Sequence, residues 1–161
     1  MNSLWTTADL CDAYGEAVQV CDLQLRHFGN RSAFCGPAST VKVFEDNVLV
    51  RQRLSTPGEG RVLVVDGSGS ERCALVGDTL AGMAIENGWA GIVVHGCVRD
   101  VTALAELDIG VLALGRSPRK CFTKGCGAND VLIEFGAVHF APGAWVYCDF
   151  DGMLVAERQM H

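Results

Sequence analysis

Three apolar runs in the middle of the chain constrain the fold more strongly than any other feature. Residues 62–65, 91–96 and 110–115 are almost entirely valine, leucine, isoleucine, alanine and glycine. Such runs are typical of parallel strands that are buried on both faces of a sheet. Residues 79–86 and 101–107, which separate the runs, carry apolar side chains at helical spacing. The sequence therefore predicts successive βαβ units and an α/β fold.

Weaker signals predict the elements on either side of these units. Thr7 is the expected N-cap of an early helix. A basic, glycine-containing loop is expected from Arg116 to Asn129, and the chain becomes strand-rich after it. The other expected elements are strands at 38–44, 73–76, 131–135, 137–140 and 144–149, and a short helix that begins at 45–47 and ends at Arg53. No repeat or charge run marks a linker, so a single domain over residues 1–161 is expected.

Charge and hydropathy exclude several classes of function. The chain has 13 Lys plus Arg against 19 Asp plus Glu and a net charge of -6, which disfavours direct binding to nucleic acid. Its apolar stretches are far shorter than the roughly 20 residues that a membrane-spanning helix needs. The N-terminus has neither the basic nor the apolar region of an export signal. A cytoplasmic protein without a membrane span is expected.

The eight cysteines are expected to be reduced for the same reason, since disulfides form mainly in oxidising compartments. The sequence has no Cys-x-x-Cys pair, and the closest spacing is from Cys121 to Cys126. A structural zinc site is therefore not expected either. Most of the cysteines are predicted to be small core residues.

One candidate site lies where the strand at 73–76 gives way to the following helix. Gly77, Asp78, Thr79 and Leu80 stand at this transition. The first amides of a helix lack intrahelical partners and lie at the positive end of the helix dipole, so they favour a carboxylate or phosphate. The simpler alternative is that Asp78 only caps the helix.

Arg99 and Asp100 follow the next buried strand and complete the candidate site. About ten helical residues cover about 15 Å and six strand residues return about 20 Å, so one helix and one strand bring the chain back to the same sheet edge. Open α/β sheets bind ligands at the carboxyl ends of their strands. Arg99 can hold a carboxylate through two hydrogen bonds, and Asp78 and Asp100 can supply oxygen ligands to Mg²⁺ or Mn²⁺. A surface Arg-Asp pair that caps the next helix is the alternative.

These residues, with several motifs elsewhere, resemble the RraA-like family. That family includes regulators of ribonuclease E activity and class II 4-hydroxy-4-methyl-2-oxoglutarate aldolases. The resemblance covers about residues 7–155, and its signature is an aspartate followed after twenty residues by Arg-Asp, here Asp78, Arg99 and Asp100. The motifs that carry it are 44–47, 60–67, 87–94, 97–100, 106–110 and 135–138.

The resemblance implies a swivelling β/β/α domain that assembles as a homotrimer, with the site in a cleft between subunits. It implies that residues 77–80 bind an α-keto acid, that Arg99 holds its carboxylate and keto oxygen, that Asp100 coordinates a divalent metal, and that Asp78 orients a water on that metal. The implied reaction cleaves 4-hydroxy-4-methyl-2-oxoglutarate to two pyruvates, with oxaloacetate decarboxylation as a side reaction. Established aldolases of the family carry an acid where this chain has Ala103, and the nearest downstream acid is Glu106.

Two other functions remain open at the level of sequence. As a ribonuclease E regulator, the acidic chain would cover a basic, RNA-binding region of its partner. A Schiff-base aldolase would need a lysine of depressed pKa, and the chain has only Lys42, Lys120 and Lys124. Lys42 falls on an expected strand, whereas Lys120 and Lys124 fall in a loop that is expected to be solvated.

Overall fold

A parallel sheet forms the centre of the molecule. The computed structural model describes residues 4–161. Its parallel strands lie in the order β3 (Phe34–Lys42), β4 (Val62–Asp66), β6 (Gly91–Val98) and β7 (Gly110–Arg116). The three apolar runs are β4, β6 and β7, as predicted. The short strand β5 (Ala74–Val76) pairs in parallel with the end of β6.

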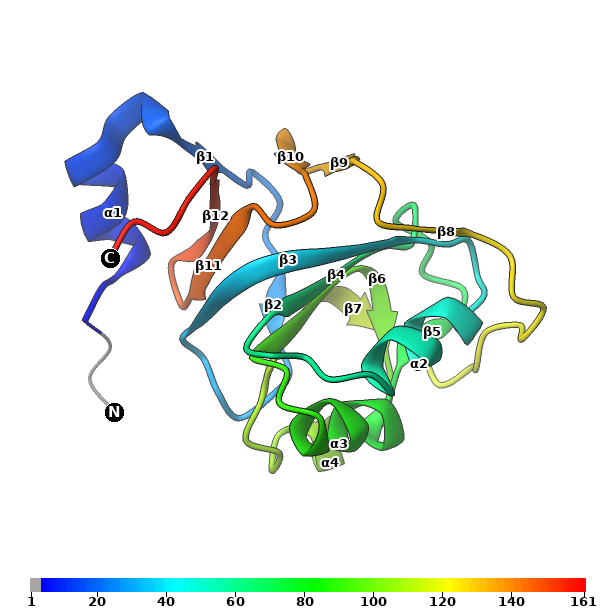
Figure 1. Ribbon diagram of the computed structural model, residues 1–161. Helices are drawn as coiled ribbons and strands as arrows, with labels where there is room; N and C mark the ends of the chain where they lie inside the picture. The colour runs from blue at the N-terminus through cyan, green and yellow to red at the C-terminus, as the bar shows by residue number, and fades with distance from the viewer. Residues whose placement is uncertain (1–3) are drawn as a thin grey trace.

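Three helices cover one face of this sheet (Figure 1): α2 (Val48–Leu54), α3 (Asp78–Glu86) and α4 (Val101–Leu104). Because side chains alternate along a strand, Leu63 and Val65 of β4 pack beneath these helices, whereas Val62 and Val64 face the other way. The helix α4 is shorter than the predicted 101–107.

A second β layer covers the opposite face. The strands β11 (Trp145–Asp149), β12 (Gly152–Ala156) and β1 (Val18–Val20) continue the sheet beyond β3, and β9 (Ile133–Phe135) and β10 (Val138–Phe140) form a hairpin. Side chains from this layer pack on Val62, Val64, Val93 and Leu112 of the central sheet. The layers therefore run β, β, α, and the predicted α/β fold is confirmed.

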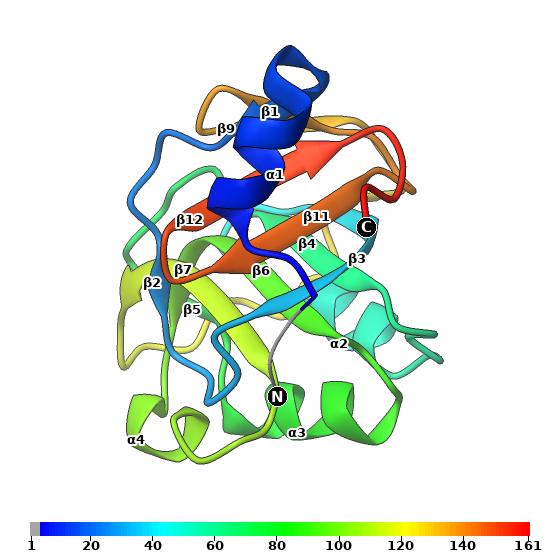
Figure 2. The same cartoon turned by 90° about the vertical axis from the view of Figure 1, so that its left-hand side faces the viewer.

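The remaining elements lie at the edges. The helix α1 (Thr7–Tyr14) and the 3-10 turn Gly15–Ala17 pack outside β11 and β12 (Figure 2). The strand β2 (Arg26–His27) pairs with β7, and β8 (Ala128–Asn129) pairs with β3. The sequence did not predict β1, β2, β8 or β12, because each is only two to five residues long and is defined by a distant partner strand. No helix within residues 4–161 is long and apolar enough to cross a bilayer.

The expected N-cap of α1 is displaced by one residue. Thr6 is the cap, since its side-chain oxygen accepts a hydrogen bond of 3.0 Å from the Asp9 amide. Thr7 is the first residue of the helix instead. Its hydroxyl and its amide both donate to the Asp149 carboxylate, at 2.6 and 2.7 Å. This contact joins α1 to the end of β11.

The expectation that all eight cysteines are reduced is wrong for one pair. Cys73 and Cys121 form a disulfide, with Cα atoms 5.1 Å apart and a sequence separation of 48. The pair is brought together because the loop after β7 returns along β5, where the Ala74 amide donates to the Arg119 carbonyl at 2.7 Å. The other six cysteines are free, and Cys21, Cys97 and Cys148 are buried as predicted.

Candidate functional site

The two predicted stretches meet at the carboxyl end of the sheet. The Arg99 amide donates to the Val76 carbonyl at 3.0 Å, so the ends of β5 and β6 lie side by side. The Asp78 amide points at the Asp100 carboxylate, with 3.4 Å between nitrogen and Oδ2. The structure thus brings Gly77, Asp78, Thr79, Leu80, Arg99 and Asp100 together around one cavity of about 80 Å³.

The turn at Asp100 determines how the site is built. Asp100 has φ 58° and ψ 42°, the left-handed region, and is the N-cap residue of α4. This conformation is unfavourable for most residues other than glycine, although aspartate and asparagine adopt it more readily. The turn directs the Asp100 carboxylate back towards the first turn of α3. Strained backbone of this kind is often found at functional sites.

Gly77 gives the Asp100 carboxylate its room. A Cβ at position 77 would lie 2.6 Å from Asp100 Oδ2 and 3.3 Å from Arg99 Cγ. A side chain at this position would therefore push apart the groups that the cavity brings together. The φ of -133° at this position suits any residue, so glycine serves here to leave the Asp100 carboxylate its place, and a Cβ would displace that side chain rather than the backbone.

We expect Gly77→Ala to lower by about 100-fold the kcat/KM of the aldol cleavage that the sequence resemblance implies, because displacement of reacting groups by about 1 Å can cost that much. Gly82→Ala is the matched control: Gly82 lies in the same helix, and a Cβ there meets nothing within 4 Å. It should keep wild-type activity and stabilise α3 by up to about 1 kcal/mol. Steady-state kinetics and thermal unfolding of both variants test this prediction, and a Gly77→Ala variant as active as Gly82→Ala would contradict it.

The charged groups of the site are open to ligands. Arg99 Nε lies 4.0 Å from Asp100 Oδ2, and the two side chains are 40% and 43% exposed. A partly exposed pair at this distance binds weakly, so the guanidinium keeps donors for a ligand. The free amides at the start of α3 add positive potential on the same side. The cavity therefore suits a small anion.

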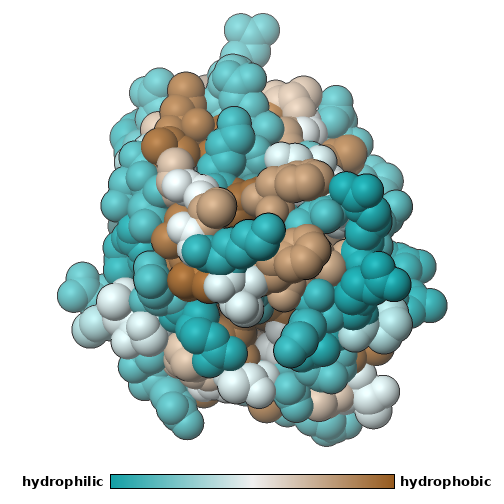
Figure 3. Space-filling view, turned by 90° about the vertical axis from the view of Figure 1, so that its right-hand side faces the viewer, coloured by the Kyte–Doolittle hydropathy of each residue, from teal (hydrophilic) through white to brown (hydrophobic). Residues whose placement is uncertain are grey.

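Five residues of the cavity were not among the predicted site residues. Asn47, Arg51 and Lys120 line it with polar or charged side chains, and Ala74 and Leu75 of β5 line it as well. Lys120 is exposed, as expected, but it borders the cavity rather than bulk solvent alone. Figure 3 shows the side of the molecule on which α2, β5 and the loop after β7 lie, where hydrophilic side chains surround apolar surface. Asn47 falls within a motif of the family resemblance, and Lys120 was considered only as a Schiff-base lysine in a solvated loop; Arg51 gave no sequence signal.

Residues 117–127, here termed the Lys120 loop, are fixed at two points. The disulfide joins Cys121 to the residue before β5. The buried Asp46 carboxylate accepts hydrogen bonds of 2.9, 2.9 and 3.2 Å from the amides of residues 124–126, and one of 3.1 Å from Val48. Burial alone would raise the pKa of Asp46, but these hydrogen bonds outweigh burial and hold the pKa below its usual value.

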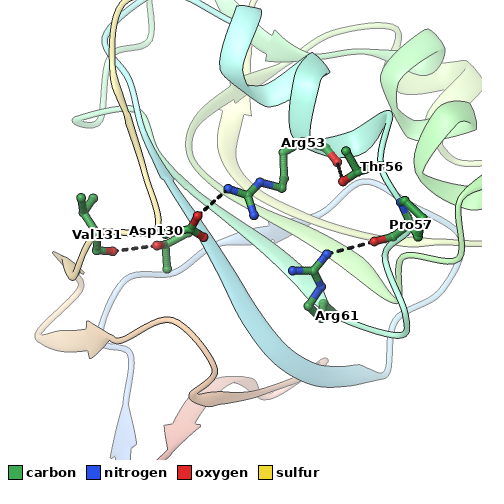
Figure 4. Close-up of polar contacts among 7 residues, drawn as sticks. Arg53, Thr56, Pro57, Arg61, Asp130 and Val131 are labelled. Carbon is green, nitrogen blue, oxygen red and sulfur yellow. Dashed lines mark hydrogen bonds and ion pairs between the residues drawn. The ribbon is translucent and has the colours of Figure 1, made fainter.

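The helix that carries Arg51 is tied down as well. Arg53, also on α2, forms an ion pair of 2.9 Å with Asp130, beside β8 (Figure 4). The loop that follows α2 is held by Arg61, whose guanidinium donates to the Pro57 carbonyl at 2.9 Å (Figure 4). Arg51 and Lys120 thus come from anchored segments on either side of the cavity.

The acidic residues of the cavity suit a hydrated divalent cation. Within residues 4–161 there is no cluster of three His, Cys, Asp or Glu side chains that could enclose a metal ion. Mg²⁺ does not need such a cluster, because it is commonly held by one or two carboxylates, with water and substrate as its other ligands. Asp100 and Asp78 both line the cavity and meet that requirement.

The chain matches known proteins over almost its whole length. Residues 7–155 match the sequence profile described as "RraA-like: Aldolase/RraA". A protein of Aromatoleum aromaticum with the name "Putative 4-hydroxy-4-methyl-2-oxoglutarate aldolase" is 51% identical over 154 residues, which is 96% of this chain and 97% of that protein.

Two solved structures have the same fold. One, titled S-adenosylmethionine:2-dimethylmenaquinone methyltransferase, from Geobacillus kaustophilus, is 51% identical, with a TM-score of 0.95 and 97% of each chain covered. The other, titled RNA-processing inhibitor RraA, from Thermus thermophilus, is 43% identical, with a TM-score of 0.94 over 100% of this chain and 96% of that one. With the profile match, these similarities show that the chain belongs to the RraA-like family.

Proposed function

We propose that the protein is a divalent-metal-dependent lyase that cleaves 4-hydroxy-4-methyl-2-oxoglutarate to two pyruvates and decarboxylates oxaloacetate. The observation that carries the proposal is the meeting of Arg99, Asp100 and the start of α3 around one small cavity. The name of the Aromatoleum aromaticum relative supports the same reaction.

Each group has a part in this chemistry. The amides of Thr79 and Leu80 bind the carboxylate of the keto acid, because the first amides of a helix have no intrahelical acceptors. The substrate C3–C4 bond breaks, its electron pair forms the enolate of one pyruvate, and the C4 hydroxyl loses its proton as the second pyruvate forms. Arg99 stabilises the negative charge that develops on the enolate oxygen. Asp78 orients the water that accepts the hydroxyl proton and returns a proton to C3 of the enolate, so that both products leave as pyruvate.

Asp100 would hold the cation, and Asp78 would orient water beside it. A bound Mg²⁺ or Mn²⁺ supplies Lewis-acid polarisation of the keto oxygen. The position of Asp100 depends on its left-handed backbone and on the space beside Gly77. We propose that a homotrimer is the active form, in which a neighbouring subunit borders the cleft.

Pyruvate release tests the proposal. The protein is incubated with 4-hydroxy-4-methyl-2-oxoglutarate or oxaloacetate and Mg²⁺ or Mn²⁺, and pyruvate is measured through lactate dehydrogenase and NADH. Light scattering on the same sample establishes the oligomeric state. We expect metal-dependent release that chelation abolishes; no release above the background of metal without protein, from intact trimer, would refute the proposal.

Two other chemistries are separated by simple observations. Because Lys120 lines the cavity, a Schiff base with pyruvate is testable by borohydride trapping, and a metal-dependent enzyme should give no trapped adduct. A methyltransferase would have to accommodate S-adenosylmethionine. Calorimetric titration with S-adenosylmethionine tests this, and a lyase for small keto acids should show no binding.

A second candidate function is regulation of ribonuclease E. It is favoured by the 43% identity to the RNA-processing inhibitor RraA of Thermus thermophilus and by the net charge of -6. Complementary charge would speed association with a basic region of the enzyme. Pull-down of ribonuclease E at low salt, unchanged by Asp100→Ala and lost at high salt, would support this function; absence of a complex at low salt would refute it.

A further inference from the structure

The cavity contains more positive charge than the proposed reaction centre uses. Arg51 and Lys120 both line it, and neither side chain forms an ion pair or hydrogen bond with any residue in 4–161. Arg53, two residues after Arg51 on the same helix, is by contrast paired with Asp130 at 2.9 Å. The helix α2 thus directs one arginine to an ion pair and leaves the other free beside the cavity.

The charges around the cavity favour a ligand with more than one negative group. Three cations, Arg51, Arg99 and Lys120, face two carboxylates, Asp78 and Asp100. A monocarboxylate held by Arg99 and the start of α3 leaves Arg51 and Lys120 without a counter-charge. A second carboxylate on the same ligand would supply one, and unpaired cations beside a cavity attract such a group strongly.

We propose that Arg51 and Lys120 form a second anion subsite that binds the distal carboxylate of the substrate, so that the enzyme selects 2-oxo dicarboxylates over 2-oxo monocarboxylates. This inference rests on the proposed function. Arg51 approaches from α2 and Lys120 from the loop after β7, while Arg99 stands at the end of β6. One ligand can therefore be held at both ends.

The anchors of the Lys120 loop belong to this subsite as positioning groups. A lysine on a mobile loop would lose conformational entropy when it bound a ligand. The disulfide at Cys121 and the contacts of Asp46 with residues 124–126 fix the backbone on the C-terminal side of Lys120. The loop backbone is therefore already ordered in the folded protein, so less conformational entropy is lost when Lys120 binds a ligand.

A neighbouring cavity offers the competing position for the distal carboxylate. Arg99 and Asp100 also border a second cavity of about 320 Å³, which is lined by Val101, Arg116, Ser117 and Pro118. It has one additional cation, Arg116, and a more apolar wall. Substitution of Arg116 therefore distinguishes the two positions.

Calorimetric titration with two unreactive acids tests the subsite. The intact oligomer, with Mg²⁺ present, is titrated with pyruvate and with 2-oxoglutarate. The latter has the same separation of carboxylates as the proposed substrate but lacks the C4 hydroxyl needed for cleavage. We expect 2-oxoglutarate to bind about tenfold more tightly than pyruvate, the effect of one charge-assisted contact at a partly exposed site. Arg51→Gln and Lys120→Gln should each lower the affinity for 2-oxoglutarate about tenfold and leave that for pyruvate within twofold, and Lys120→Arg should retain the preference.

Lys124→Gln is the matched control. Lys124 lies in the same loop with the same charge, but its ammonium stands 5.2 Å from the Phe122 ring centroid and the residue does not line the cavity. It should change neither affinity. Arg51 and Lys120 are exposed, so the variants should unfold at the wild-type temperature.

Several results would overturn the subsite. If Arg51→Gln and Lys120→Gln lower the affinities for pyruvate and for 2-oxoglutarate equally, these cations bind the keto-acid end of the ligand instead. If only Arg116→Gln removes the preference, the distal carboxylate lies in the neighbouring cavity. Pyruvate binding and turnover without any preference for the dicarboxylate would refute the subsite and leave the proposed function intact, whereas failure to bind either acid or to release pyruvate would refute both.

Discussion

Arg99→Ala should lower kcat/KM for pyruvate release by about 10³-fold, the largest effect expected of any single substitution. Arg99 Nε lies 4.0 Å from Asp100 Oδ2, and the residue lines the cavity together with the start of α3. Loss of one preorganised donor to a developing oxyanion costs about 10²–10³ in rate, and Arg99 also contributes to carboxylate binding. Steady-state kinetics with 4-hydroxy-4-methyl-2-oxoglutarate and Mg²⁺ measure the change.

The fold should survive this substitution. The Arg99 side chain is 40% exposed, and its contact with Asp100 spans 4.0 Å, so the variant should unfold within a few degrees of wild type. Arg99→Lys, which retains the charge without the two parallel donors, should recover only part of the activity. A folded Arg99→Ala variant with wild-type kcat/KM would exclude Arg99 from the reaction.

Asp46→Ala should lower the free energy of unfolding by about 2–3 kcal/mol. Asp46 is 2% exposed, and its carboxylate accepts four backbone hydrogen bonds, three of them from residues 124–126. Hydrogen bonds to a charged acceptor contribute about 1.5–3 kcal/mol each, and the buried donors would lose their acceptor together. Denaturant unfolding measures the loss, and Asp46→Asn, which keeps one carbonyl acceptor, should lose less.

The stabilisation that the Asp46 carboxylate provides should be lost at low pH and retained at neutral pH. The pKa of Asp46 in the folded state lies below its usual value, so the carboxylate stabilises the fold at every pH above its unfolded pKa of about 4. The contribution is lost as the pH falls below 4 and through the folded-state pKa. The stability difference between wild type and Asp46→Ala should thus stay constant from pH 7 to 5 and shrink below pH 4. A constant difference down to pH 2 would contradict this assignment.

Local sequence patterns predicted the parts of the fold that local patterns determine. The apolar runs of β4, β6 and β7 were evident because strands buried on both faces leave no polar positions. The meeting of Gly77 with Arg99 and Asp100 followed from the lengths of one helix and one strand, which are geometric constants of the backbone. The roles of these residues in catalysis remain predictions, to be tested by the experiments above.

Long-range pairing accounts for what the sequence did not reveal. Cys73 and Cys121 are 48 residues apart, and only the return of the Lys120 loop along β5 brings them together. The same return places Lys120 beside the cavity, where a loop of Lys, Arg and Gly had suggested solvent alone. Nothing in the local sequence distinguishes Arg51 from Arg53. Only Arg53 forms an ion pair, because Asp130, far along the chain, lies beside it in the fold.

The most direct test of the central claim is a crystal structure of the protein with pyruvate and Mg²⁺ bound. We predict that the pyruvate carboxylate lies against the amides of Thr79 and Leu80, that its keto oxygen lies within hydrogen-bonding distance of the Arg99 guanidinium, and that the metal ion is bound to Asp100. Pyruvate bound elsewhere in the molecule, with the space between Gly77 and Asp100 empty at saturating ligand, would contradict the account.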